Sequence, residues 1–139
     1  MSDIAITAAS VLPSSTATIE QGVAGATITQ GQALYIDTSD SNKLKLADAD
    51  GTSPANAFAG IALNAASSGQ KITYCSKDLG GFTVGGTVAV GDDIWLAPNP
   101  GGITKTRADL LTGDTVIHLG VINSSSKLIL NPVAGGNVP

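Results

Sequence analysis

The sequence predicts an all-β fold, a sandwich or barrel built from two related β units with an extended N-terminal segment. Apolar residues recur at a period of two, as in Ile4-Ala5-Ile6 and Leu44-Lys45-Leu46. Clusters of Gly, Pro, Asn, Asp and Ser interrupt these runs at short intervals, which is typical of turns between strands. The intervals are too short for the helices that would connect parallel strands, so an α/β fold is not expected.

The N-terminal segment, residues 1–21, is expected to be extended and to precede a single β domain over residues 22–132. A sheet edge can accept an extended peptide from another subunit through main-chain hydrogen bonds. The apolar residues of this segment are therefore candidate interface residues, and they are Ile4, Ile6, Val11, Leu12 and Ile19. An ordinary edge strand would explain the same pattern, so both interpretations stay open.

The β domain contains an internal repeat, visible when the chain is aligned with itself at an offset of 60 residues. Gapless matches include Gly31 with Gly91, Leu34 with Ile94, Tyr35 with Trp95, and Gly60 with Gly120. The two units cover about 26–75 and 86–131, and each places one large aromatic in its first strand. Tyr35 and Trp95 are therefore candidate core aromatics, provided that the units pack face to face. Chance matches between two alternating β sequences are the competing explanation.

Three shorter segments complete the chain. The only candidate helix, and a weak one, runs from Ser53 to Ala59. The glycine-rich stretch from Gly80 to Gly86 connects the two units as a hinge or tight crossover, since no Lys-Ser/Thr follows it as in a phosphate loop. Residues 133–139 are expected to form a flexible tail, or else a second extended arm.

Composition excludes several classes of function. The chain has 139 residues, about one domain, with 13% charged residues and a net charge of −4. Nucleic acids and anionic membranes are bound by clustered Lys and Arg, so neither is an expected partner. The first residues have no basic region and no long apolar run, and no stretch is long enough to cross a bilayer. We expect a protein made in a cytoplasm.

The sequence contains little chemistry for catalysis or metal binding. Cys75 and His118 are the only cysteine and the only histidine, which excludes an internal disulfide and a Cys/His zinc site. His118 lies within an apolar strand pattern, which favours packing or half-exposure over catalysis. The chain is therefore expected not to be an enzyme, with no catalytic, cofactor-binding or metal-binding residues and no cofactor.

Two stretches resemble a known family. The first runs from Ala24 to Asp37 and continues in Gly60-Ile61-Ala62-Leu63-Asn64; the second is Val90-Gly91-Asp92-Asp93-Ile94-Trp95-Leu96-Ala97. Over about residues 22–132, the chain resembles the small capsid decoration, or cement, proteins of tailed bacteriophages. The stretch before Gly22 matches this family poorly.

The resemblance implies a structural virion protein on the outer surface of a phage head, where it stabilises contacts between subunits of the major capsid protein. It also implies a homo-oligomer, either a trimer or a dimer. The N-terminal apolar residues are then candidate contacts with another subunit or with the capsid. The low charge is independently compatible with broad, weakly polar contacts. The alternative is a receptor- or glycan-binding β module of a phage tail fibre or surface appendage, although its aromatic residues are few.

Overall fold

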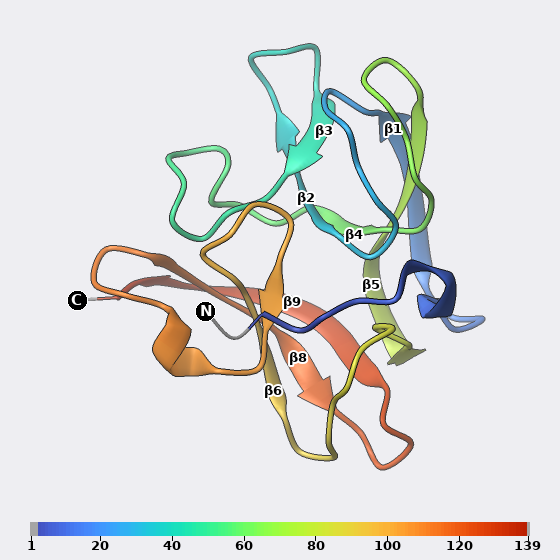
Figure 1. Cartoon of the computed structure of the whole chain (residues 1–139), viewed down its shortest axis with the longest axis vertical. Helices are drawn as coiled ribbons and strands as arrows, with labels where there is room; N and C mark the ends of the chain where they lie inside the picture. The colour runs from blue at the N-terminus through green and yellow to red at the C-terminus, as the bar shows by residue number, and fades with distance from the viewer. Residues whose placement is uncertain (1–2, 139) are drawn as a thin grey trace.

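The computed structural model describes residues 3–138, which form antiparallel strands and two short 3-10 turns (Figure 1). This architecture confirms the all-β prediction, and the sheet curls into a half-barrel. The strands are β1 Thr18–Val23, β2 Ala33–Asp37, β3 Lys43–Leu46, β4 Gly60–Ala62, β5 Lys71–Phe82, β6 Asp93–Leu96, β7 Ile103–Thr104, β8 Thr115–Ile122 and β9 Leu128–Asn137. The 3-10 turns are η1 Ala8–Ser10 and η2 Arg107–Asp109.

The long strand β5 lies at the centre of the sheet. The strand order is β3-β2-β4-β5-β9-β8-β6-β7, and β1 also pairs with β5. The order β5-β4-β2-β3 on one side corresponds to β9-β8-β6-β7 on the other. We call the strands β2 to β4 with the start of β5 the first half, and β6 to β9 the second half.

Two turns, one before β2 and one before β6, make the same contacts at an offset of 60 residues. In each turn, a glycine N–H donates to a backbone carbonyl two strands later in the chain. A side-chain oxygen in the same turn accepts from the backbone N–H of the residue three positions before it. The bonds are Gly31 to Ala62 (2.8 Å), Gly91 to Ile122 (2.9 Å), Thr29 to Gln32 Oε1 (2.8 Å) and Ala89 to Asp92 Oδ2 (2.8 Å). Both glycines have positive φ, 97° and 89°, a conformation that other residues rarely adopt.

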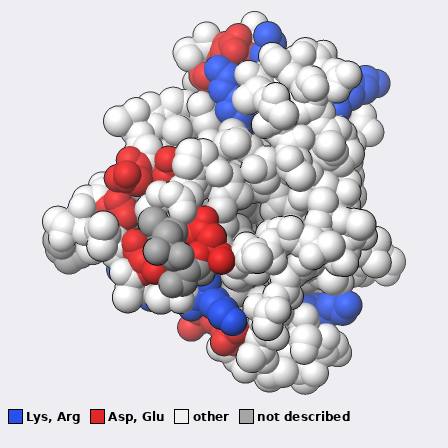
Figure 2. All heavy atoms as spheres, viewed as in Figure 1, with Lys and Arg blue, Asp and Glu red and all other residues white. Residues whose placement is uncertain are grey.

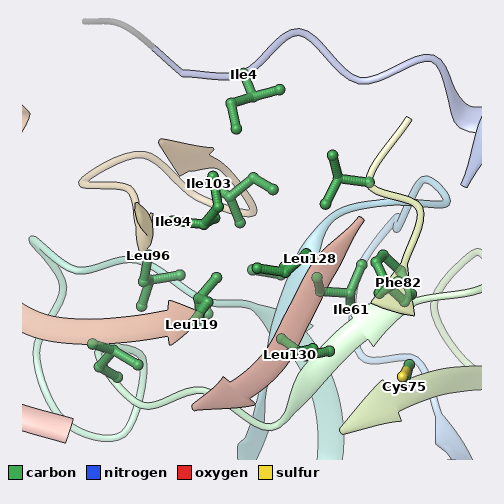
Figure 3. Packing of buried hydrophobic residues seen from close by; sticks show 14 of the residues in the cluster. Ile4, Ile61, Cys75, Phe82, Ile94, Leu96, Ile103, Leu119, Leu128 and Leu130 are labelled. Carbon is green, nitrogen blue, oxygen red and sulfur yellow. The ribbon is translucent and has the colours of Figure 1, made fainter. Parts of the chain in front are cut away.

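The hydrophobic core consists of two clusters. The main cluster lies within the second half and between the halves, and includes Phe82, Ile94, Leu119 and Leu128 (Figure 3). The smaller cluster lies on one side of the first half, where Ala24, Ile28 and Ala66 cover the sheet residues Leu34, Leu44, Ala62, Ile72 and Tyr74. Burying each large aliphatic side chain contributes about 1.5–3 kcal/mol, so both clusters stabilise the sheet.

The N-terminal segment runs along the molecule rather than away from it. Isolated bridges join Asp3 to Thr104 and Leu12 to Thr83, and β1 begins at Thr18, inside the predicted arm. Ile4 and Val11 are buried in the main cluster, so the structure corrects their assignment as interface residues (Figure 3). The burial of these apolar side chains against the chain's own core is the physical reason.

The other predicted interface residues are more accessible. Ile6 is half-buried against the main cluster. Leu12 and Ile19 are exposed, with 63% and 43% of their surface accessible. Of the five predicted interface residues, Leu12 and Ile19 are the two that are exposed enough for contact with another molecule.

The prediction of a flexible tail is wrong for residues 133–137, which belong to β9. Paired strands hold this end, since Gly113 donates to Val138 (2.9 Å) and Val138 donates to Asp114 (2.8 Å). The last residue, Pro139, lies outside the described residues. The weak helix predicted from Ser53 to Ala59 is also absent, because this segment forms turns.

Candidate interaction surface

The outer face of β6, β8 and β9 carries the most distinctive side chains of the molecule. Trp95 pairs with His118, which pairs with Val133, and Asp93 pairs with Val121, which pairs with Ile129. Residues directly opposite each other on neighbouring antiparallel strands project from the same face. We call these six residues, together with the adjacent Arg107, the Trp95 face.

Alternation along the strands explains why this face is open. Ile94, Leu96 and Leu119 point to the other side and are fully buried in the main cluster. The alternating side chains therefore face outwards, and 40% of Val121 and 56% of Val133 remain accessible. An outward apolar group of this kind is a candidate binding surface.

The central side chains of the Trp95 face form a row of contacts. His118 Nε2 lies 2.9 Å from Asp93 Oδ1. The imidazole meets the Trp95 ring edge-on, with centroids 4.7 Å apart and an interplanar angle of 64°. The Arg107 guanidinium lies over the indole, 5.7 Å from the ring centroid. The indole thus lies between the His118 imidazole and the Arg107 guanidinium. The row of contacts begins at the Asp93 carboxylate and ends at the Arg107 guanidinium.

The two candidate core aromatics lie at the margin of the core rather than inside it. Tyr35 and Trp95 are half-buried and pack against the main cluster. The aromatic residues that the core does bury are Phe82 and Tyr74. Phe82 follows two glycines in a stretch predicted to be a linker, and only the continuation of β5 through residue 82 places it in the core.

A charged cluster occupies the hairpin between β2 and β3. Lys45 Nζ lies 2.8 Å from Asp37 Oδ2 and 3.0 Å from Asp40 Oδ2. The hydrogen bond from Lys45, assisted by Ser39, lowers the pKa of Asp37 to about 2, and both carboxylates raise the pKa of Lys45. The opposite charges are satisfied within the hairpin, so the cluster serves the local structure.

A second acidic group lies near the end of β9. Asp48 accepts a hydrogen bond from the N–H of Asp50 (3.0 Å), and the neighbouring Asp114 raises the pKa of Asp50 through a shared hydrogen bond. Asp114 is itself buried and accepts from Leu111 N–H (2.8 Å). Within residues 3–138, no three His, Cys, Asp or Glu side chains are arranged to hold a metal ion. These carboxylates stabilise turns.

Most of the molecular face in Figure 2 carries no charged side chain, and its acidic and basic groups lie in small separate clusters. A hollow of about 360 Å³ beside the β8–β9 ribbon is also uncharged. Its walls are Asn56, Ala57, Phe58, Thr115, Ile117, Pro132 and Ala134. Such surfaces suit contact with other proteins better than the binding of a charged small molecule.

The single cysteine and the single histidine are not arranged as an activated nucleophile and its base. Cys75 is fully buried, and this burial raises its pKa to about 11, so the thiol stays protonated at neutral pH. His118 has the carboxylate of Asp93 as its partner, and in the described part of the chain no hydroxyl or thiol hydrogen-bonds to the imidazole. No helix in residues 3–138 has the length and apolarity needed to cross a membrane.

Searches of protein-family models, curated proteins and solved structures found no match to this chain.

Proposed function

We propose that this chain is a structural virion protein that binds the outer surface of a phage head and stabilises contacts between major capsid subunits. The supporting observation is the Trp95 face, an ordered and accessible surface with no evident chemical task except binding. Trp and Arg are the residues most enriched among those that dominate the energy of protein interfaces. Trp95 and Arg107 are already in contact, so binding would require little further ordering of either side chain.

The fold suits such a role because it presents rigid β surfaces. Main-chain hydrogen bonds connect every strand, and the N-terminal segment adds further bonds across the sheet. A body of this kind transmits load between the subunits that it touches without changing shape. A homo-oligomer that binds several subunits at once would gain avidity of about 10²–10⁴ over a single contact.

The proposal includes no reaction. The buried thiol of Cys75 and the carboxylate-bound imidazole of His118 provide no activated nucleophile. The net charge of −4 provides no electrostatic attraction to nucleic acid or to an anionic membrane. Binding energy alone would reinforce the shell.

The half-exposure of Trp95 favours the alternative function of a receptor- or glycan-binding module, because sugar rings stack on accessible aromatic rings. Asp93 and His118 could provide hydrogen bonds to hydroxyl groups beside the indole. However, Arg107 lies over the Trp95 ring and would compete with a sugar for it. We therefore place this function second.

Co-sedimentation with undecorated mature capsids of the phage that encodes the chain tests the proposal. We expect saturable binding at a fixed ratio to capsid subunits. Trp95→Ala should weaken binding by roughly tenfold or more, as expected of a central interface residue. Tyr35→Ala is the matched control, because Tyr35 is half-buried at the corresponding position of the first half. Failure to bind capsids, combined with binding to a glycan array, would establish the alternative instead.

A further inference from the structure

We propose that the open edge of β1 binds an extended segment of another polypeptide, which adds to the sheet as a further strand. The segment carries one basic residue between uncharged neighbours, of which the β-branched ones fit best. The occupant follows from the covering of the other sheet edges, from the direction of the β1 backbone groups and from the charge of Glu20. β1 shares no residue with the Trp95 face, so the inference does not depend on the proposed function.

The sheet has three edge strands, and segments of the chain cover two of them. Along β7, Ile4 N–H donates to Ile103 O (2.9 Å), and beside β3, Gly25 N–H donates to Leu44 O (2.8 Å). β1 pairs with β5 on one side, at the margin of the sheet in Figure 1. On its other side, only the following residue, Ala24, bridges Leu44. Among the described residues, β1 is thus the edge strand left open.

The backbone groups of Ile19 and Gln21 point away from β5. The N–H of Ala24, directly after β1, donates to Gln70 O (2.8 Å) in the same register as β1. Hydrogen-bonded positions alternate along an antiparallel pair, so the bonds to β5 recur at every second residue before Ala24 and pass over Gln21 and Ile19. No loop within residues 3–138 bonds to the N–H or C=O groups of these two residues. An extended backbone offers donors and acceptors at the spacing that such an edge requires.

The open edge lacks the Lys and Pro residues that usually block an exposed strand. The six residues Thr18–Val23 include neither, and three of the six are β-branched. Ile19 and Val23 expose 43% and 40% of their surface. Alternation places both side chains on the same side of β1, so β-branched side chains of an added strand would pack beside them.

The charge of Glu20 favours a foreign segment over a second copy of this chain. Glu20 is exposed between Ile19 and Gln21, and none of the ion pairs among residues 3–138 includes it. A second copy would have to bring its own β1, and antiparallel pairing of Ile19 with Gln21 places the two Glu20 carboxylates opposite each other, which is unfavourable. A basic residue opposite Glu20 turns this repulsion into attraction. Lys71 and Lys77 of β5 lie beside the two ends of β1, so one central basic residue fits better than a basic run.

A displayed library of random decapeptides, selected on the immobilised protein, tests the inference. We expect enrichment of sequences with one Lys or Arg between β-branched residues. Gln21→Pro removes the outward N–H and places the proline ring at the edge, so it should raise the dissociation constant of a synthetic enriched peptide by roughly tenfold or more. Gln21→Thr keeps the N–H and is the matched control, with an expected change of less than about twofold.

Two further measurements stay informative even where the proline variant fails to fold. Glu20→Lys should make the selection favour Asp or Glu at the central position, because it reverses the charge that the added strand meets. The bound peptide should slow hydrogen exchange at the Ile19 and Gln21 amides by roughly tenfold or more. The amides of Glu20 and Gly22, which already bond to β5, should change little and serve as internal controls.

The absence of enriched peptides would overturn the inference, and so would enriched peptides that protect neither outward amide. Unchanged binding by a Gln21→Pro variant that circular dichroism shows to be folded would overturn it too. Light scattering distinguishes the remaining occupant, since a dimer that Gln21→Pro dissociates would assign the edge to a second copy instead.

Discussion

The two halves of the sheet have the same strand order, but they differ in what covers their faces. In the first half, Leu34 lies under Ala24 and Ile28 on one side, whereas Ile61 and Cys75 enter the main cluster on the other. In the second half, one face enters the main cluster, whereas the Trp95 face stays partly accessible, although Trp95 itself packs against that cluster. A repeated strand order can thus produce a fully covered layer in one place and a binding surface in another, depending on the neighbouring segments.

The halves also fill their cores differently. Gly22 on β1 pairs with Ile72, and at the offset of 60 residues Phe82 pairs with Leu128. Phe82, the last residue of β5, is completely buried against the second half, whereas Leu44 and Tyr74 fill the space beside Gly22 in the first half. The second half therefore contributes more apolar volume at this position. Removing side-chain volume should therefore destabilise the protein at Phe82, whereas adding side-chain volume should destabilise it at Gly22.

The rate of thiol labelling should differ between the two halves by a larger factor than any other property considered below. Cys75 is buried on the covered face of the first half, and the aligned residue of the second half is the exposed Asn131. We expect the native thiol to react with an alkylating reagent at neutral pH roughly a hundredfold or more slowly than the new thiol of Cys75→Ala/Asn131→Cys. In denaturant the two rates should converge. Equal rates in the native state would remove the distinction between a covered and an open face.

Truncating Phe82 should have the largest effect on stability. Phe82→Ala removes a fully buried ring from the main cluster, and we expect it to lower the free energy of unfolding by about 3–5 kcal/mol. Tyr35→Ala, at the half-buried margin, should lower it by less. Urea denaturation measures both. A loss of under about 1 kcal/mol for Phe82→Ala would show that the second half does not depend on this side chain.

Adding a methyl group at Gly22, which aligns with Phe82 at the offset of 60 residues, should have an intermediate effect on stability. A Cβ atom at Gly22 would lie 2.5 Å from Leu44 Cδ2, so the buried leucine would have to move. We expect Gly22→Ala to lower the free energy of unfolding by about 1–3 kcal/mol. At Gly135 the nearest atom, Val116 Cγ1, would be 3.5 Å away, so Gly135→Ala is the control. Equal effects in thermal denaturation would argue against tight packing around Gly22.

Acid titration should have the smallest effect, and it should act on the first half. Lys45 holds the pKa of Asp37 at about 2, below its ordinary value. The stability that this contact contributes is therefore present above about pH 4 and is lost as the pH falls towards 2. Asp37→Asn should flatten the acid-side decline in melting temperature. An unchanged slope would mean that the β2–β3 hairpin does not contribute to acid sensitivity.

The outcome for Trp95 shows where sequence patterns reach their limit. The repeat pairs Trp95 with Tyr35, but the side of the sheet on which an aromatic residue lies depends on strand register. The pairing of β6 with β8 shifts between Ile94 and Trp95, and that of β8 with β9 shifts between His118 and Gly120. Each irregularity changes which residues are opposite each other. The alignment of His118 with Trp95 was therefore not predictable from spacing.

The N-terminal segment shows a second limit. Its apolar residues indicate that something must bury them, but the pattern is the same whether the burying surface belongs to this chain or to another. The structure places Ile4 and Val11 against the chain's own core and leaves Leu12 exposed. A bond from Ile4 N–H to Ile103 O (2.9 Å) connects residues far apart in the sequence. A contact between residues so far apart in the sequence leaves no recognisable pattern in either local stretch.

By itself, the sequence determined the all-β class, the positions of the turns and the scarcity of catalytic groups, because these depend on alternation over a few residues and on which side chains are present. The tertiary structure alone decided which face of each strand is covered, that residues 133–137 continue a strand, and that Asp93, His118, Trp95 and Arg107 form one row. The physical reason is that burial and side-chain contact belong to pairs of distant segments. A short stretch of sequence contains only one member of each pair.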